Sequence, residues 1–489
     1  MTNVFSKLEP TALWRYFELI TQTPRCSGNE GPLGEKLTAI AREHGLDLRT
    51  DTVGNLVILI PAAEGCEAWP TVVLQGHLDM VCEKNNGVVH DFERDPIEVT
   101  REGDWLEAKD TTLGADNGIA IAAAMAMIDD APPRHGALEL LFTVDEERGL
   151  TGATHMGPEM LKGKLLLNLD SEEEGTVTVG CAGGGDTQMI LPLEREAAPK
   201  GRWVARLSVG GLTGGHSGLD INKNRANALR CLGAALDHLN SACLSLRVVS
   251  LGGGNMRNAI PREAVATLLL DPTERERAET CCEDVLQALR VEFGVSDPEL
   301  NLRLEVVDEA PGQVLAPDCA RRAVALLLAT PTQVTAMSRE IPTLVETSTN
   351  LGVVEETEGG LRYTNCTRSS IGKALEGVRQ GLKALGELAG AIVKLEPAYP
   401  GWAPNLASPL LARFQEVHLE LFGKEAEVAA LHAGLECGLI GEHVPGMDMI
   451  SFGPTMVGVH APGEKLHIGS AERFYHLLKA LLLALEPPK

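Results

Sequence analysis

The sequence predicts an α/β fold in two parts: a first domain built on a mixed sheet, and an α+β domain inserted within it. Three observations lead to this prediction. Short apolar runs alternate with helical stretches over the first third of the chain, the composition changes after residues 183–185, and the first pattern returns beyond Trp402. Alternating strands and helices are typical of α/β proteins. The 489 residues also exceed the roughly 250–300 at which a single core stops growing.

The elements of the first domain follow from these runs. An amphipathic helix is predicted after Pro10, and the alanine-rich segment IAIAAAMAMI predicts a second helix after Gly118. Apolar runs predict buried strands near Leu56, from Thr71, from Leu138 and over residues 164–170. Later, SPLLARFQEVHLELFG predicts a helix and MDMISFG a short strand. We therefore expect the first domain to comprise residues 1–185 and 400–489.

The inserted domain is predicted over residues 186–399. The run ARLSVGG predicts a strand that leads into a glycine-rich loop, and a helix is expected from about Lys223 to Asn240. The runs LRVVSL, AVATLLL and LRLEVV predict further strands, and a helix rich in Glu and Arg should follow Pro272. Strands and helices in this order are typical of an α+β layer.

Composition excludes several classes of function. The formal charge of −25 opposes binding to nucleic acid, which depends on Lys and Arg. No apolar run approaches the roughly 20 residues of a membrane span, and the N-terminus lacks the pattern of a signal peptide. Eleven cysteines are scattered without a CxxC pair. Reduced thiols and a cytoplasmic location are therefore expected.

The segment GHLDM places His77 and Asp79 two residues apart at the end of a predicted strand. Their side chains can point the same way, and a carboxylate beside an imidazole is typical of a metal ligand and its orienting partner. A hydrogen-bonded structural pair is the alternative, and this segment alone favours it.

Further acids follow the next predicted elements. In TTLGADNG, Asp116 lies on a tight turn before a helix, where it could bind a metal or cap the helix. Glu146 and Glu147 follow a buried strand. Adjacent carboxylates there repel one another unless a cation or proton neutralises them, which suggests one base and one ligand. Solvated loop acids are the alternative.

Two more candidates complete a ligand set. Asp170 ends a predicted strand, and His460 follows a glycine-rich turn near the C-terminus, with His467 as its competitor. Carboxylates mixed with imidazoles are donors that suit zinc, manganese or cobalt, and they differ from the thiolate-rich donors of structural zinc sites. The set is large enough for two ions that share a bridging carboxylate.

At this point the sequence resembles the co-catalytic zinc peptidases of the M20 family, which include carboxypeptidase G and the aminoacylases. The resemblance rests on GHLDM, TTLGADNG, DEE and the late His460. The segments NLDSEEEG, CAGGGD, GLTGGHSG, GGGNMRNAIPRE, AYPGW and HAGLECGL are similar to the bacterial aminoacyl-histidine dipeptidase branch, also called peptidase D or Xaa-His dipeptidase. The similarity covers essentially the whole chain.

The resemblance implies two divalent ions per chain. His77, Asp116 and Asp170 would hold one ion, and Asp116, Glu147 and His460 the other, with Asp116 as the bridge. Asp79 would orient His77, and Glu146 would activate a water that bridges the metals. Asp110 departs from the small residue common in relatives and would add negative charge near the bridge.

The resemblance also assigns roles to the inserted domain, as a lid that mediates a homodimer. His216 of GLTGGHSG would stabilise the oxyanion in a neighbouring active site, and Arg368 of NCTRSS would bind the carboxylate of a small peptide. A structural ion pair is the alternative for Arg368. Asn258 and Glu436 would line the substrate pocket.

The expected function is hydrolysis of dipeptides, preferentially Xaa-His such as β-alanyl-histidine. An N-acyl amino acid deacylase or a broader di- or tripeptidase on the same ions is the first alternative, because lid and pocket select the substrate. A binding protein that retains the fold is the second, and it would lack a ligand or the base. No residue of the expected set is missing.

Overall fold

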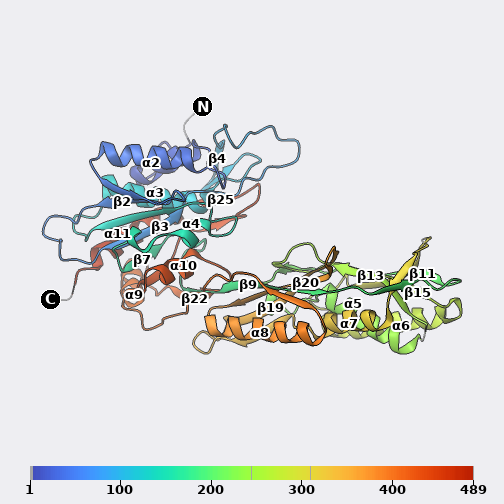
Figure 1. Cartoon of the computed structure of the whole chain (residues 1–489). Coiled ribbons are helices and arrows are strands. Elements are labelled where there is room, and N and C mark those ends of the chain that lie inside the picture. The colour runs from blue at the N-terminus through green and yellow to red at the C-terminus, as the bar shows by residue number, and fades with distance from the viewer. Residues whose placement is uncertain (1–3, 244, 309, 488–489) are drawn as a thin grey trace. The chain divides into compact units, whose positions relative to one another are not determined.

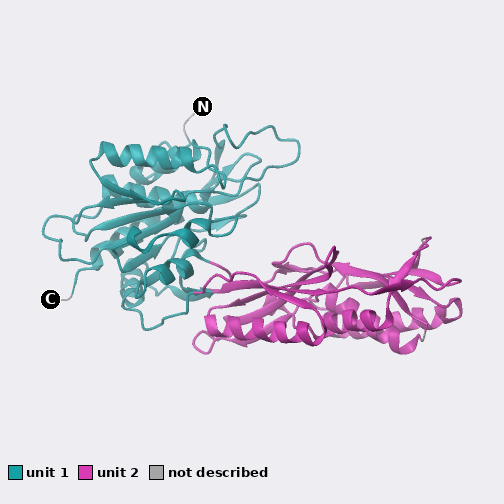
Figure 2. Cartoon of the chain, in the orientation of Figure 1, with its two compact units in different colours: residues 1–181, 402–430, 435–489 teal, residues 182–401, 431–434 magenta. Residues whose placement is uncertain are grey.

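The computed structural model describes residues 4–243, 245–308 and 310–487. The chain divides into two compact units, coloured separately in Figure 2. Unit 1 comprises residues 1–181, 402–430 and 435–489, and unit 2 comprises residues 182–401 and 431–434. Unit 1 is therefore discontinuous in sequence.

Unit 1 is an α/β unit. Its helices are α1 (Thr11–Thr21), α2 (Gly31–Glu43), α3 (Ala115–Asp130), α4 (Thr151–His155), α9 (Pro409–Phe422), α10 (Glu436–His443) and α11 (Ile468–Ala484), with the 3₁₀ turn η1 (Pro158–Met160). Its strands are β1 (Asp47–Thr50), β2 (Leu56–Ile60), β3 (Val72–His77), β4 (Val99–Glu102), β5 (Trp105–Ala108), β6 (Leu138–Thr143), β7 (Leu165–Asn168), β8 (Thr176–Cys181), β22 (Glu427–Leu431), β23 (Asp448–Ser451), β24 (Met456–Val457) and β25 (Lys465–His467).

The main sheet of unit 1 has the strand order β1-β2-β6-β3-β7-β23-β8-β22. Strand β3 is parallel to both β6 and β7, whereas β1 with β2 and β2 with β6 are antiparallel, so the sheet is mixed as predicted. Every residue of β3 and β6 is buried, which agrees with their apolar sequences. Because β3, β6 and β7 run in the same direction, their carboxyl ends meet at one edge of the sheet.

Unit 2 combines a sheet with a layer of helices. Its helices are α5 (Ala228–Ala242), α6 (Arg275–Phe293), α7 (Pro317–Ala329) and α8 (Gly372–Leu388), with the 3₁₀ turns η2 (Ile221–Lys223) and η3 (Pro272–Glu274). Its strands are β9 (Gly183–Leu191), β10 (Arg195–Ala197), β11 (Trp203–Gly210), β12 (Gly215–His216), β13 (Arg247–Gly253), β14 (Ala259–Ile260), β15 (Ala264–Leu270), β16 (Asn301–Val306), β17 (Gln313–Leu315), β18 (Gln333–Met337), β19 (Val345–Thr357), β20 (Gly360–Ser369) and β21 (Ile392–Leu395).

The large sheet of unit 2 has the order β16-β11-β15-β13-β19-β20-β9-β21, and β18 also pairs with β19. Figure 1 shows α5 to α8 lying along one face of this sheet. Buried leucines of α5, β11 and β15 form the core between the two layers. The short strands β12 and β14 pair separately, and His216 lies in β12 opposite Ala259.

One predicted helix begins where expected and another does not. Helix α3 is assigned from Ala115, but Asp116 and Asn117 depart from helical φ and ψ, so its regular part begins near Gly118. Helix α5 begins at Ala228 instead of near Lys223, because Asn224 adopts a left-handed conformation with φ of 51° and ends the turn η2. The side chain of Asn227 then accepts hydrogen bonds from the first turn of α5 and caps it.

The expectation that all cysteines are reduced is wrong for one pair, because Cys26 and Cys82 form a disulfide. The backbone joins the same two segments, since Cys26 forms an isolated parallel β-bridge with Met80. The other cysteines carry buried free thiols, as expected. Among the described residues, we find no helix with the length and apolar character to cross a membrane.

Candidate metal centre

Three predicted ligands meet where the parallel strands end. His77 is the last residue of β3, and Asp170 lies two residues beyond β7. Asp116 comes from the first turn of α3. His77 Nε2 lies 3.1 Å from Asp116 Oδ1 and 3.4 Å from Asp170 Oδ1. One atom from each residue falls within 4.8 Å of the others, which is close enough for one ion.

A second triad shares Asp116. His460 Nε2 lies 3.0 Å from Asp116 Oδ2 and 3.1 Å from Glu147 Oε2. The two oxygens of Asp116 therefore face different histidines, Oδ1 toward His77 and Oδ2 toward His460. A carboxylate with this geometry can bridge two ions.

The loop at Asp116 is held by its neighbour Asn117, which sequence reasoning missed. Asn117 is fully buried. Its side-chain oxygen accepts a hydrogen bond from the backbone N–H of His77 (3.3 Å), and its amide donates to the carbonyl of Leu169 (3.1 Å). One side chain thus connects the segments of three candidate ligands. The motif GADNG contained this asparagine, but nothing in its spacing indicated the contacts.

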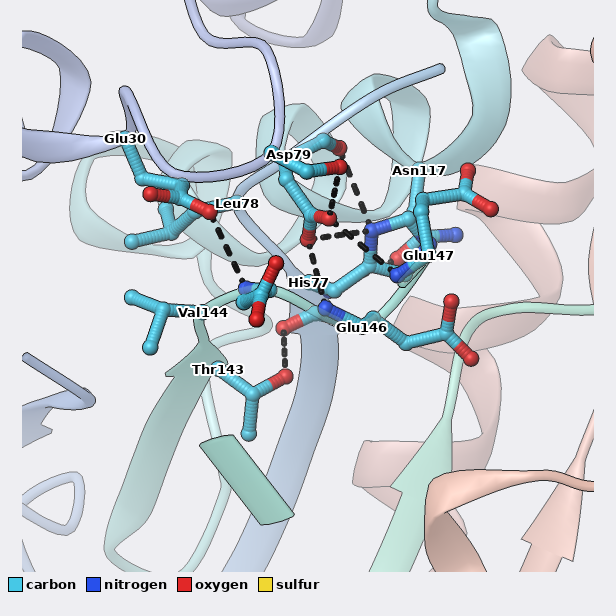
Figure 3. A network of polar contacts seen from close by, with 12 residues as sticks. Glu30, His77, Leu78, Asp79, Asn117, Thr143, Val144, Glu146 and Glu147 are labelled. Carbon is cyan, nitrogen blue, oxygen red and sulfur yellow. Dashed lines mark hydrogen bonds and ion pairs between the residues drawn. The ribbon is translucent and has the colours of Figure 1, made fainter. Parts of the chain in front are cut away.

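Asp79 joins His77 to the loop that follows β6. Its Oδ1 lies 3.3 Å from His77 Nδ1. Its carboxylate also accepts hydrogen bonds from the backbone N–H groups of Glu146 (3.0 Å) and Glu147 (3.1 Å) and from the Ser27 hydroxyl (2.7 Å). Figure 3 shows the Asp79 carboxylate between His77 and this backbone. Although burial opposes the charge, these donors hold the pKa of Asp79 well below its usual range.

The side chain of Glu146, unlike that of Asp79, lies in an environment that favours its protonated form. The backbone N–H of Glu146 donates a hydrogen bond to the Asp79 carboxylate, whereas the Glu146 side chain extends away from that carboxylate (Figure 3). Burial, followed by the charges of Asp170, Glu436 and Glu147, raises the pKa of Glu146 well above its usual range against the attraction of His77. A carboxyl group that takes up a proton readily is suited to general-base work.

The residues fit divalent cations on chemical grounds. Burial and the nearby charges of Asp116 and Glu147 raise the pKa of Asp170 to about 7, against the attraction of His77. Glu147 Oε1 is buried without a hydrogen-bond partner. Close carboxylates and an unpartnered buried oxygen are costly unless a cation is present. Mixed imidazole and carboxylate donors suit zinc, manganese or cobalt.

Two further residues that the sequence singled out, His467 and Asp110, belong to neither triad of described residues. His467 lies outside the triads: its Nδ1 accepts a hydrogen bond from the backbone N–H of Ser470 and caps α11, and its ring contacts Trp105 edge-on. Asp110 is exposed, and its carboxylate accepts a hydrogen bond from Asn85 at 3.3 Å. No candidate ligand group among the described residues includes Asp110.

Unit 2 brings Arg368 and His216 together. Arg368 lies on β20 and is 6% exposed. Its Nη2 lies 3.3 Å from His216 Nε2, and its Nη1 donates to the Tyr399 hydroxyl at 3.1 Å. Burial and the positive charge of Arg368 lower the pKa of His216 to about 4. The pair therefore consists of a cation and a neutral imidazole at neutral pH.

Asn258 and Glu436 occupy different environments. The carbonyl of Asn258 accepts a hydrogen bond from the N–H of Ser217, next to His216. Glu436 is completely buried, and its Oε2 accepts hydrogen bonds from Gln75 and Thr143, both at 2.6 Å. These partners lie on β3 and β6, whereas Oε1 of Glu436 is buried without a hydrogen-bond partner, and a place for Glu436 in the substrate pocket stays a prediction.

The comparisons with known proteins identify relatives of this chain. The model of peptidase family M20/M25/M40 matches residues 73–484. The cytosol non-specific dipeptidase of Escherichia coli strain K12 is 41% identical over 478 residues, which cover 98% of each chain. The crystal structure of aminoacylhistidine dipeptidase from Vibrio alginolyticus superposes with a TM-score of 0.91 at 40% identity, and the match covers 100% of this chain and 99% of that one.

A more distant structure shows the fold alone. Aminopeptidase PepT from Bacillus cereus matches with a TM-score of 0.56 at 14% identity, over 98% of this chain and all of that one.

Proposed function

Because the chain belongs to peptidase family M20/M25/M40, we propose that this peptide-bond hydrolase is a metal-dependent dipeptidase that prefers Xaa-His dipeptides such as β-alanyl-histidine. The observation that carries the proposal is the pair of triads that share Asp116, with Glu146 adjacent to Glu147. The names of the two similar proteins, a non-specific dipeptidase and an aminoacylhistidine dipeptidase, support dipeptides as the substrate class. The first of these names also supports a cytoplasmic location.

The residues of unit 1 would bind the metals, transfer the proton and orient His77. His77, Asp116 and Asp170 would hold one ion and Asp116, Glu147 and His460 the other, with zinc as the favoured metal. Two such ions, when bound, supply Lewis-acid activation of the scissile carbonyl and of the attacking water. Glu146 accepts the proton of that water, since its raised pKa favours the protonated form, and then donates the proton to the departing amine. Asp79 keeps His77 in the orientation that presents Nε2.

Unit 2 would supply substrate selection. Arg368 offers two parallel donors that match the C-terminal carboxylate of a dipeptide. Neutral His216 accepts hydrogen bonds at Nδ1 from the N–H groups of Gly218 and Leu219, which leaves the Nε2 proton to stabilise an oxyanion. We propose that His216 does so from a partner subunit in a homodimer formed through unit 2. A monomeric mass in solution would exclude this role.

The first experiment measures hydrolysis of β-alanyl-histidine by protein that has been stripped with a chelator and titrated with zinc. Activity that returns as zinc approaches two per chain, measured by elemental analysis, is the expected result. Alanyl-alanine and a tripeptide test breadth, and an N-acetyl amino acid tests the deacylase alternative. Two bound zinc ions with turnover of the N-acetyl substrate alone would replace the dipeptidase proposal with a deacylase.

A further inference from the structure

One buried carboxylate outside the two triads contacts the loop of the bridging ligand directly. Glu464 is 2% exposed. Its Oε2 accepts hydrogen bonds from the backbone N–H groups of Leu113 (2.7 Å) and Gly114 (2.9 Å), and its Oε1 accepts from Ala115 (2.8 Å) and Asp116 (3.3 Å). Four consecutive N–H groups at the start of α3 thus converge on one side chain. Their partial positive charge attracts a carboxylate.

A buried cation balances this carboxylate across the same loop. Arg25 is 2% exposed, and its guanidinium donates to the carbonyls of Leu78 (3.0 Å), Asp79 (2.6 Å) and Gly114. Glu464 therefore binds the N–H side of the Asp116 loop, while Arg25 binds a carbonyl of that loop and two carbonyls after β3. The opposite charges reduce the cost of burying either group.

Glu464 is close in sequence to the candidate ligand His460. It lies four residues after His460, in the connection between β24 and β25. Backbone hydrogen bonds from Ala461 to Gly458 and from Glu464 to Ala461 hold this connection in consecutive turns. A displacement of Glu464 relative to the Asp116 loop would therefore also displace His460 relative to Asp116.

From these contacts we infer that Glu464 is a positioning residue for the metal centre: its carboxylate sets the separation of Asp116 and His460 and so controls affinity for the ion that these two residues share with Glu147. This inference rests on the proposed metal centre. Glu464 joins the segments that carry Asp116 and His460, which are two of the three ligands of that ion. In the other triad, only Asp116 lies on a segment that Glu464 contacts. The Glu147–His460 ion should therefore depend on Glu464 more strongly than the His77–Asp170 ion.

The alternative is a carboxylate that only stabilises the fold, and unit 1 offers a matched control. Glu139 is 1% exposed and accepts hydrogen bonds from the N–H groups of Lys162 and Gly163 and from Arg49. It belongs to neither triad. Glu139→Gln should therefore lower stability without changing zinc affinity.

The experiment measures zinc binding to metal-free full-length protein by competition with a chromophoric chelator. Wild type should bind two ions. Glu464→Gln replaces two accepting oxygens with one and places an amide N–H₂ against backbone donors, so one of the two ions should bind about 10- to 100-fold more weakly, a range typical for groups that support ligands. Glu464→Asp keeps the charge but shortens the reach, and it should show a smaller loss with a fold confirmed by circular dichroism.

A double variant identifies the affected ion. Because Glu464 and His460 are inferred to act mainly on the same ion, adding Glu464→Gln to His460→Ala should weaken the remaining zinc far less than Glu464→Gln alone weakens the affected ion. Wild-type affinity for both ions in folded Glu464→Gln and Glu464→Asp overturns the inference and leaves the proposed dipeptidase intact. Failure of wild type to bind a pair of ions overturns the metal centre and, with it, this inference.

Discussion

Asp79 and Glu146 show how one cluster gives two carboxyl groups different chemistry. Asp79 accepts three hydrogen bonds from N–H and hydroxyl donors in addition to its contact with His77, and these hold its pKa down. Glu146 is buried among other acids, and this raises its pKa. An ionised carboxylate can orient an imidazole, and a carboxyl group with a raised pKa can carry a proton between water and a leaving group.

Glu146→Gln should separate catalysis from metal binding. The amide keeps the size of the side chain but cannot accept the proton, so kcat should fall by roughly 10²- to 10⁴-fold. Zinc content by elemental analysis and the thermal midpoint should stay close to wild type. Glu173→Gln, which removes an exposed acid of the same unit, provides the comparison. A Glu146→Gln enzyme with full activity would exclude Glu146 as the base.

His432 predicts a pH dependence of stability in unit 2. It is 5% exposed and contacts the Ser348 hydroxyl at 2.7 Å. Burial, followed by the charge of Arg368, lowers its pKa from 6.5 to about 3. Between these values the unfolded chain binds a proton that the folded chain does not. His432 therefore reduces stability as the pH falls through 6.5 toward 3, and has no such effect above 6.5.

The measurement is urea denaturation of the metal-free protein between pH 5 and 7. His432→Gln should reduce the slope of the free energy of unfolding against pH, by at most about 1.4 kcal/mol per pH unit for one proton. His238→Gln changes an exposed histidine of the same unit and serves as the control. An unchanged slope in His432→Gln would show that His432 titrates similarly in the folded and unfolded chains.

At the scale of elements, the approach of α3 to β3 depends on a residue without a side chain. A Cβ on Gly76 would lie 2.9 Å from the Cβ of Ala120 and would also meet the side-chain oxygen of Asn117. That oxygen accepts the N–H of His77. The absence of a side chain at position 76 thus allows the helix start, which carries Asp116, to lie beside the strand end, which carries His77.

Gly76→Ala should therefore separate the helix from the strand. Overpacking of this kind costs about 1–3 kcal/mol, and we expect a lower free energy of unfolding together with weaker zinc binding. Gly34→Ala is the matched control, because a Cβ there meets only Leu78 Cδ1 at 4.0 Å and Gly34 lies inside α2. The control should be neutral or more stable by up to about 1 kcal/mol. Equal effects of the two substitutions would contradict the packing argument.

The elements also show what sequence can predict. The proximity of His77 and Asp170 could be predicted because both follow apolar strands, and parallel strands bring their carboxyl ends together. The contacts of Glu464 were not found, because they involve backbone N–H groups that have no sequence signature. The Cys26–Cys82 disulfide was missed for a similar reason: its partners are 56 residues apart and meet through the loops that surround Asp79.

At the scale of the whole molecule, composition and the change of pattern after residue 183 were enough to predict an α/β unit interrupted by an α+β segment. The mixed sheet of unit 1 agrees with that prediction. The strand order could not be predicted, because β23 lies between β7 and β8 although it follows them by more than 200 residues. Such pairings depend on tertiary packing and leave no local pattern in the sequence.

The order β7-β23-β8 also has a consequence for biosynthesis. On the ribosome, His77, Asp116, Asp170 and Glu147 emerge before residue 182, so the nascent chain holds every group of the first triad while the strand between β7 and β8 has yet to be made. His460 appears only after the whole of unit 2 has been translated. Vectorial synthesis therefore supplies the residues of the first triad early and His460 late, so that both triads are complete only in a finished chain.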